Sequence, residues 1–170
     1  MVRLDVLWAP WRMAYIEYAK IERGEGCFIC KAVESSELEE NLVVYKGEKI
    51  IVMLNRYPYN TGHLLVAPTR HVADFSQLSD EELFSLAKAV SLSLELLKKA
   101  LSPDGFNVGV NLGRVAGAGL ESHLHVHVVP RWNGDTNFMP VIADAKVIPE
   151  ALKDTRRKLL KHVDVFEGLR

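Results

Sequence analysis

The sequence predicts an α+β domain with an antiparallel sheet of about five strands, one long helix and a C-terminal helix. Five short apolar segments are bounded by turn residues, and one central stretch repeats its apolar residues at helical spacing. Strands and helices do not alternate regularly, which argues against a parallel α/β fold. The 170 residues, 48% of them hydrophobic, suffice for one domain with its own core.

The expected strands are short and lie on both sides of the long helix. They are Leu42–Lys46, Ile50–Leu54, His63–Ala67, Phe106–Val110 and Leu124–Val129. Gly47 favours a tight turn between the first two. Residues 55–61 contain Pro58 and Asn60 and are expected to form a loop.

The long helix is expected from Asp80 to Ala100. Ser79 is a good N-cap residue, Glu82 completes a capping box, and Pro103 ends the helix. Its apolar stripe is expected to face the core. The stripe consists of Leu83, Leu86, Ala87, Val90, Leu94, Leu97 and Leu101.

We expect three regions: an N-terminal extension over 1–26, a main domain over 27–140 and a helical tail over 141–170. The extension carries the segment WAPWR and a short helix that ends near Tyr18. The run 24–30 is read as a loop. The tail is expected to form a helix from Pro149 to about Val163, with Arg156 on a solvated basic face.

The overall composition excludes several classes of protein. The net charge is −1, so no global attraction draws the chain to nucleic acid or to an anionic membrane. No apolar run is long enough to span a bilayer, and the N-terminus lacks the apolar core of a signal peptide. We therefore expect a cytoplasmic protein that binds neither nucleic acid nor a membrane.

Three histidines alternate with apolar residues in the last expected strand. His123, His125 and His127 share one face because the side-chain period of a strand is two. Three interpretations are open: a metal site, nucleotidyl transfer by a neutral imidazole, or a polar strand face without chemistry. The preceding segment Gly113–Gly119 is rich in small residues that let backbone N–H groups approach phosphate, which favours nucleotidyl transfer.

The pattern H-φ-H-φ-H-φ-φ, where φ is apolar, resembles the signature of the histidine-triad (HIT) superfamily of nucleotide hydrolases and transferases. The segment Asn55–Val66 is similar to the strand–loop–strand that precedes this signature. Pro130–Trp132 and Leu7–Arg12 resemble the diadenosine polyphosphate-cleaving branch, hydrolase or phosphorylase. The resemblance implies an HIT-like fold and cleavage at the α-phosphate of an adenine nucleotide.

The resemblance also implies roles for individual residues. His125 matches the nucleophile that forms a covalent AMP adduct, and a backbone carbonyl on its second nitrogen would fix the reactive tautomer. His127 matches the residue that assists the leaving group. The other expected site residues are His123 and His63 in the catalytic set, with Asn55, Asn111, Gly117, Gly119 and Trp132 at the substrate. The position of Gly119 is often Gln or Ser in relatives. Because that side chain is missing here, the resemblance leaves open whether the covalent intermediate is hydrolysed or phosphorolysed.

Cys27 and Cys30 are spaced like two ligands of a zinc site. His71 and His123 are candidates for the missing pair, and some relatives of the family use a Cys–Cys–His–His set for a structural zinc. The alternatives are a reduced pair without metal and a redox couple. Trp132 could stack on a base of the substrate, and packing in the core or at an interface is an equal alternative.

Two other functions stay open beside the diadenosine polyphosphate enzyme. One is a nucleoside phosphoramidate hydrolase of the Hint branch, acting on adducts of the AMP-lysine type. The other is a non-catalytic nucleotide- or zinc-binding module. The resemblance also implies a homodimer.

Overall fold

The computed structural model describes residues 26–137, 139 and 146–169. The chain divides into two compact units, one of residues 1–26 and 136–147, the other of residues 27–135 and 148–170. The expected helix near Tyr18 and the WAPWR segment lie outside the described residues. In the first unit, the Lys146 ammonium donates to the Thr136 hydroxyl at 3.1 Å. All that follows concerns the second unit.

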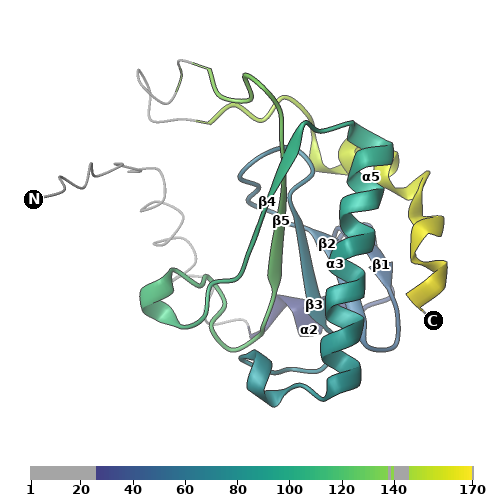
Figure 1. Cartoon of the computed structure of the whole chain (residues 1–170), viewed down its shortest axis with the longest axis vertical. Coiled ribbons are helices and arrows are strands. Elements are labelled where there is room, and N and C mark those ends of the chain that lie inside the picture. Colours follow the sequence, from purple (N-terminus) through teal and green to yellow (C-terminus); the bar gives the residue numbers. More distant parts are fainter. Residues whose placement is uncertain (1–25, 138, 140–145, 170) are drawn as a thin grey trace, which may run out of the picture. The chain divides into compact units, whose positions relative to one another are not determined.

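The five expected strands form one sheet in which every neighbouring pair is antiparallel, as predicted. The strand order is β1-β2-β3-β5-β4 (Figure 1). The strands are β1 Val43–Lys46, β2 Ile50–Leu54, β3 Leu64–Pro68, β4 Gly105–Gly109 and β5 Val126–Arg131. The observed strand that differs most from its expected bounds is β5, which was expected from Leu124 and begins at Val126. The amide of Leu124 donates instead to the Val72 carbonyl outside the sheet.

The long helix α3 spans Asp80–Leu101, and both hydrogen bonds of the predicted capping box between Ser79 and Glu82 are present. It packs against β2, β3 and β5 (Figure 1). The predicted stripe is only partly right, because Leu83 is 37% exposed and Ala87 is exposed as well. The buried residues of α3 are Leu86, Ala89, Leu92, Ser93, Leu96 and Leu97. Ala89 and Ser93 are small, which lets this side of the helix approach the sheet closely.

The C-terminal segment shares the core of the sheet. Helix α5 spans Leu152–Leu160, shorter than predicted, and a 3-10 turn follows over Val163–Leu169. Phe166 is fully buried and its ring stacks on Tyr45 at 4.6 Å between centroids. The prediction of a solvated Arg156 is wrong: the side chain is buried, and its Nε donates to the Val43 carbonyl at 2.7 Å.

The prediction of a loop over 24–30 is wrong from Phe28 onwards, because a seven-residue helix, α2, spans Phe28–Glu34. The Cys27 sulfur caps it by accepting a hydrogen bond from the Cys30 amide. Ile29 and Ala32, three residues apart, are fully buried. Less than two helical turns give too little periodicity for the sequence to reveal this helix.

The sheet is covered on both faces. One face carries α3 and the larger apolar cluster, which includes Leu64, Val66 and Val128. The alternate residues, among them Leu65 and Met53, pack with α2 on the opposite face. Among the described residues, no helix combines the length and apolarity needed to cross a bilayer. The cytoplasmic location stays a prediction.

Candidate active site

Four histidines line the α2 face of the sheet. His127 pairs directly with Leu65 in the β3–β5 ladder, and His125 and His123 continue the same alternation along the chain. His63 precedes β3 and joins them. Exposed fractions of 0% for His63, 1% for His123 and 6% for His125 show that this is an interior surface. Where a buried ring nitrogen has a hydrogen-bond partner, that partner fixes whether the nitrogen carries the proton.

The partner of His125 is a carbonyl. Its Nδ1 lies 2.8 Å from the backbone oxygen of His123. A carbonyl can only accept, so Nδ1 carries the proton and Nε2 carries the lone pair. Burial lowers the pKa of His125 from its ordinary value, which keeps the ring neutral. The geometry thus presents an unprotonated ring nitrogen, the form that acts as a nucleophile.

In His127 the proton lies on the other ring nitrogen, and a backbone amide fixes it there through His63. The N–H of Tyr59 donates to Nδ1 of His63 at 3.1 Å, so the proton of neutral His63 lies on Nε2. That nitrogen lies 2.9 Å from Nδ1 of His127 and donates to it. Because Nδ1 of His127 accepts, its own proton lies on Nε2. We call this chain from Tyr59 through His63 to His127 the imidazole relay.

The electrostatics of the imidazole relay agree with this assignment. Burial, together with repulsion from His127 and His125, lowers the pKa of His63 to about 3. His63 is therefore neutral at physiological pH and holds a single proton. The rings of His125 and His127 stand edge to face, 5.0 Å between centroids. A nucleophilic nitrogen thus neighbours an N–H donor, an arrangement suited to attack on phosphorus beside a charged oxygen.

A second cluster lies at the other end of the histidine face, where Cys27, Cys30, His71 and His123 could hold a metal ion. Their ligand atoms all lie within 4.8 Å of one another. Nδ1 of His123 is 3.2 Å from the Cys27 sulfur, and Nδ1 of His71 is 3.2 Å from the Cys30 sulfur. Tetrahedral zinc with ordinary bond lengths would place S and N about 3.6 Å apart. The four residues therefore fit a closed tetrahedral site.

The protonation of this cluster also suits a cation. Nε2 of His123 lies 2.9 Å from the Pro68 carbonyl and must donate to it, which leaves the Nδ1 lone pair towards the sulfurs. Burial and the neighbouring Cys27 raise the pKa of the Cys30 thiol to about 11. A bound cation reverses such a shift and stabilises the thiolate.

The expected substrate residues are placed unequally. Asn55, buried at the end of β2, has Nδ2 3.4 Å from Nδ1 of His63, beside the imidazole relay. Asn111 donates to the Gly117 carbonyl at 3.4 Å and so braces its own loop. Gly117 has a φ of 83°, a conformation that glycine adopts without strain. Gly119 is half-buried in the same loop.

Trp132 has a packing position in this chain. Its indole N–H donates to the Leu101 carbonyl at the end of α3, 3.3 Å away. It lies seven positions beyond His125, roughly 23 Å along an extended strand. A contact between Trp132 and substrate stays a prediction with no support from this arrangement.

Tyr59 has a role that its residue type does not indicate. Its contribution is a backbone N–H, which every residue except proline possesses, so its side chain carries no signal. The only sequence indication is its place in the loop directly before His63.

A family model described as HIT domain matches residues 36–134. The chain is 44% identical over 162 residues to a protein of Mycobacterium tuberculosis called AP-4-A phosphorylase, covering 92% of this chain and 83% of the relative.

Two solved structures are similar. A hypothetical histidine triad nucleotide-binding protein from Sulfolobus tokodaii strain7 has a TM-score of 0.61 at 30% identity, over 84% of this chain and 97% of that one. A Zn-bound histidine triad family protein from Mycobacterium smegmatis has a TM-score of 0.60 and covers 91% of this chain and 96% of its own. At 22% identity, the latter shows the fold alone.

Proposed function

Because the chain belongs to the histidine-triad (HIT) family, we propose that it cleaves diadenosine polyphosphates at the α-phosphate through a covalent AMP adduct on His125. The observation that carries this proposal is the pair of opposite tautomers: a lone pair on Nε2 of His125 beside a proton on Nε2 of His127. The 44% identity to an AP-4-A phosphorylase supports the substrate class.

In the first step, Nε2 of His125 attacks the α-phosphorus. A P–N bond forms, the bridging P–O bond breaks, and its electron pair leaves on the departing nucleotide. Nε2–H of His127 donates a hydrogen bond to the oxygen that takes up this charge. His125 becomes a nucleotidyl imidazolium whose Nδ1–H still donates to the His123 carbonyl. No proton needs to move in this step.

In the second step, an acceptor oxygen attacks the same phosphorus and the P–N electron pair returns to Nε2 of His125. With phosphate as acceptor the product is ADP, and with water it is AMP. The relative's name supports phosphate.

Product analysis with diadenosine tetraphosphate, in the presence and absence of inorganic phosphate, tests this proposal. We expect ATP and ADP only when phosphate is present. AMP formed at an equal rate without phosphate would make the protein a hydrolase. Tight nucleotide binding without any turnover would instead support a non-catalytic module.

The metal cluster is proposed to hold a structural Zn²⁺. Four protein ligands close a tetrahedral site, so zinc would supply rigidity rather than an open position for catalysis. Elemental analysis of protein purified without chelator should give about one zinc per chain, and Cys27→Ser should lower it. Well under one zinc per chain in the wild type would overturn this proposal.

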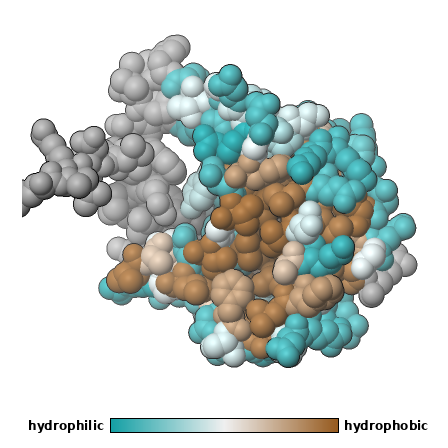
Figure 2. All heavy atoms as spheres, in the orientation of Figure 1, coloured by the Kyte–Doolittle hydropathy of each residue, from teal (hydrophilic) through white to brown (hydrophobic). Residues whose placement is uncertain are grey.

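We further propose that the enzyme is a homodimer that pairs through β4 and the adjacent side of α3. β4 lies at one edge of the sheet, and its Val108 is 47% exposed. The α3 residues Leu83 and Leu94, part of the predicted stripe, are exposed or only partly buried. Figure 2 shows a continuous apolar surface on the face that carries α3. Exposed edges and apolar patches of this kind are typical of interfaces.

Light scattering coupled to size exclusion tests the dimer. The wild type should elute at twice the chain mass of 19.1 kDa, and Val108→Lys should move it towards the monomer. A wild type that stays monomeric at micromolar concentration would contradict the proposal.

A further inference from the structure

The imidazole relay depends on where the loop 55–62 places the Tyr59 amide. The neighbouring residue, Asn60, anchors this loop. It is 5% exposed, and its Nδ2 donates both to the Pro130 carbonyl at 3.1 Å and to the Asp135 carboxylate at 2.7 Å. Its backbone oxygen accepts from the His63 amide at 3.1 Å. Asn60 thus ties the loop to the end of β5 and to the turn that follows it.

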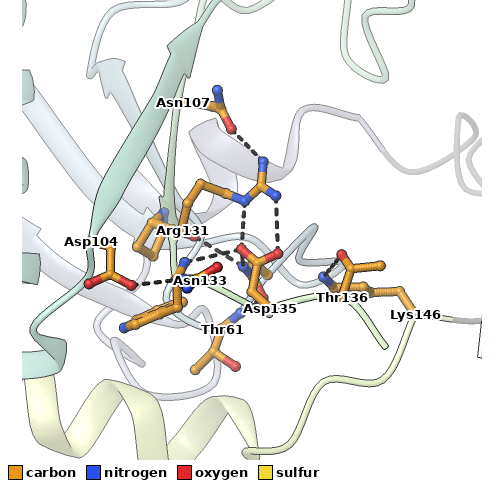
Figure 3. Close-up of polar contacts among 11 residues, drawn as sticks. Thr61, Asp104, Asn107, Arg131, Asn133, Asp135, Thr136 and Lys146 are labelled. Atoms are coloured by element: carbon orange, nitrogen blue, oxygen red, sulfur yellow. Dashed lines mark hydrogen bonds and ion pairs between the residues drawn. The ribbon is translucent and has the colours of Figure 1, made fainter. Parts of the chain in front are cut away.

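Asp135 is itself held firmly. Its side chain is 6% exposed, and its two carboxylate oxygens accept from Nε and Nη2 of Arg131 at 2.6 and 3.0 Å (Figure 3). The Trp132 amide donates to it as well. Arg131 is braced in turn by Asn107 on β4, 2.8 Å away (Figure 3). The Asp135 carboxylate is therefore held in place, and its hydrogen bond with Asn60 fixes the position of Asn60.

The turn beside Asn60 has little room to move. Gly62 has a φ of +78°, and a Cβ there would come within 2.6 Å of Leu101 and 3.3 Å of Pro130. The turn therefore lies pressed against α3 and β5. The anchor at Asn60 and this contact at Gly62 hold the loop from two sides.

We propose that Asn60 and Asp135 are positioning residues that hold the Tyr59 amide against His63 and thereby keep the proton of His127 on Nε2. The effect of this positioning on catalysis rests on the function proposed above. If the amide withdraws, Nδ1 of His63 loses the nearer of its two donors, at 3.1 Å, and keeps only the longer 3.4 Å contact with Nδ2 of Asn55. His63 can then carry its proton on Nδ1, and His127 can reverse in the same way. A lone pair on Nε2 of His127 would repel the phosphate oxygen that it otherwise stabilises.

The informative variant is Asn60→Asp, which keeps the shape but opposes two carboxylates at a separation of 2.7 Å. The double variant Asn60→Asp with Asp135→Asn reverses donor and acceptor and should restore part of the contact. Asp104→Asn is the control. Its carboxylate accepts at 2.8 Å from the amide of Asn133, which lies in the same turn as Asp135 (Figure 3).

Long-range ¹⁵N–¹H NMR of the imidazoles, without substrate, reads the tautomers directly. We expect a single Nε2–H form of His63 and His127 in the wild type and in Asp104→Asn. Asn60→Asp should show a mixture, and the double variant should return towards the wild type. The proposal is overturned if Asn60→Asp and Asp135→Asn both keep the wild-type tautomers. If Asn60→Asp does not fold, Asp135→Asn alone decides.

Kinetics with AMP aryl esters of graded leaving-group basicity provide the second readout. Asn60→Asp should lose about 10-fold to 10²-fold in kcat with the most basic leaving groups, less than removal of a whole electrostatic donor. It should lose little with the most acidic ones. A uniform loss across the series indicates a merely structural role and contradicts the proposal. Failure of the wild type to turn over any ester would count against the proposed function, while the NMR result would still decide the positioning role.

Discussion

The two faces of the sheet both carry buried side chains, but those side chains are held together in different ways. On the α3 face, residues such as Leu64, Val66 and Leu96 form a core of apolar side chains. On the α2 face, four imidazoles replace part of that core, and their hydrogen bonds fix the proton positions. Apolar packing tolerates exchange of similar side chains, whereas a buried imidazole without its partner is costly. Truncation of an apolar side chain on the first face should lower stability alone. Replacement of an imidazole on the second face should change chemistry, and it should also lower stability wherever a buried partner is left unpaired.

The sharpest contrast comes from His125→Asn. Loss of the nucleophile should reduce kcat for diadenosine tetraphosphate by on the order of 10⁴-fold or more, by analogy with other covalent catalysts. Thermal unfolding should change little, because the amide can still donate to the His123 carbonyl. Turnover within tenfold of the wild type would show that this face does not contain the nucleophile.

On the α3 face, Leu96→Ala should have the opposite effects. Leu96 is fully buried, and its truncation should lower the free energy of unfolding by about 2–5 kcal/mol. The kcat per folded molecule at low temperature should stay at the wild-type value. The control is Phe84→Ala on the same helix, where the side chain is 73% exposed and about 0.5 kcal/mol or less is expected. A selective loss of kcat in Leu96→Ala would break the contrast.

The pH dependence of stability should reveal the histidine face. With a folded-state pKa of about 3 and an ordinary value of 6.5, His63 takes up its proton more readily when unfolded. Its full contribution to stability is present above pH 6.5 and is lost as the pH falls towards 3, with about 2 kcal/mol lost by pH 5.

The measurement is urea unfolding at pH 7 and pH 5. His63→Asn should show a smaller difference between the two values than the wild type. His162→Asn, beyond α5, should behave as the wild type does. An unchanged difference in His63→Asn would mean that His63 is not buried as a neutral ring.

The smallest expected effect concerns the cap of α3. Ser79→Ala removes the hydroxyl that accepts from the Glu82 amide and should cost about 1 kcal/mol. Because Ser79 is exposed at the start of α3, outside the histidine face, kcat should not change. Chemical denaturation gives the first quantity, and initial rates give the second.

The fold was predictable wherever a local pattern decides it. Alternation located the strands, and Ser79 with Glu82 located the start of α3, because these signals lie within a few residues. The sequence could not reveal α2, which is too short for a periodic pattern, or the burial of Arg156, which depends on a carbonyl of β1 far away in the chain. Leu83 and Leu94 were predicted to face the core, because an apolar stripe on a helix does not show whether the sheet or a partner covers each residue.

The site was predictable in its residue types but not in its protons. Period-two spacing placed His123, His125 and His127 on one face, and the spacing of Cys27 and Cys30 indicated half of the metal cluster. The tautomers depend on backbone groups of Tyr59, His123 and Pro68. Backbone atoms are the same in every residue, so their contribution appears only when the chain is folded.

The most direct test is to trap the adduct. Wild-type protein mixed briefly with diadenosine tetraphosphate, without phosphate, and then denatured should gain the mass of one AMP group. Fragmentation should locate that group on His125, and His125→Asn should show none. Turnover without any adduct, or an adduct that persists in His125→Asn, would contradict the assignment of His125 as the nucleophile.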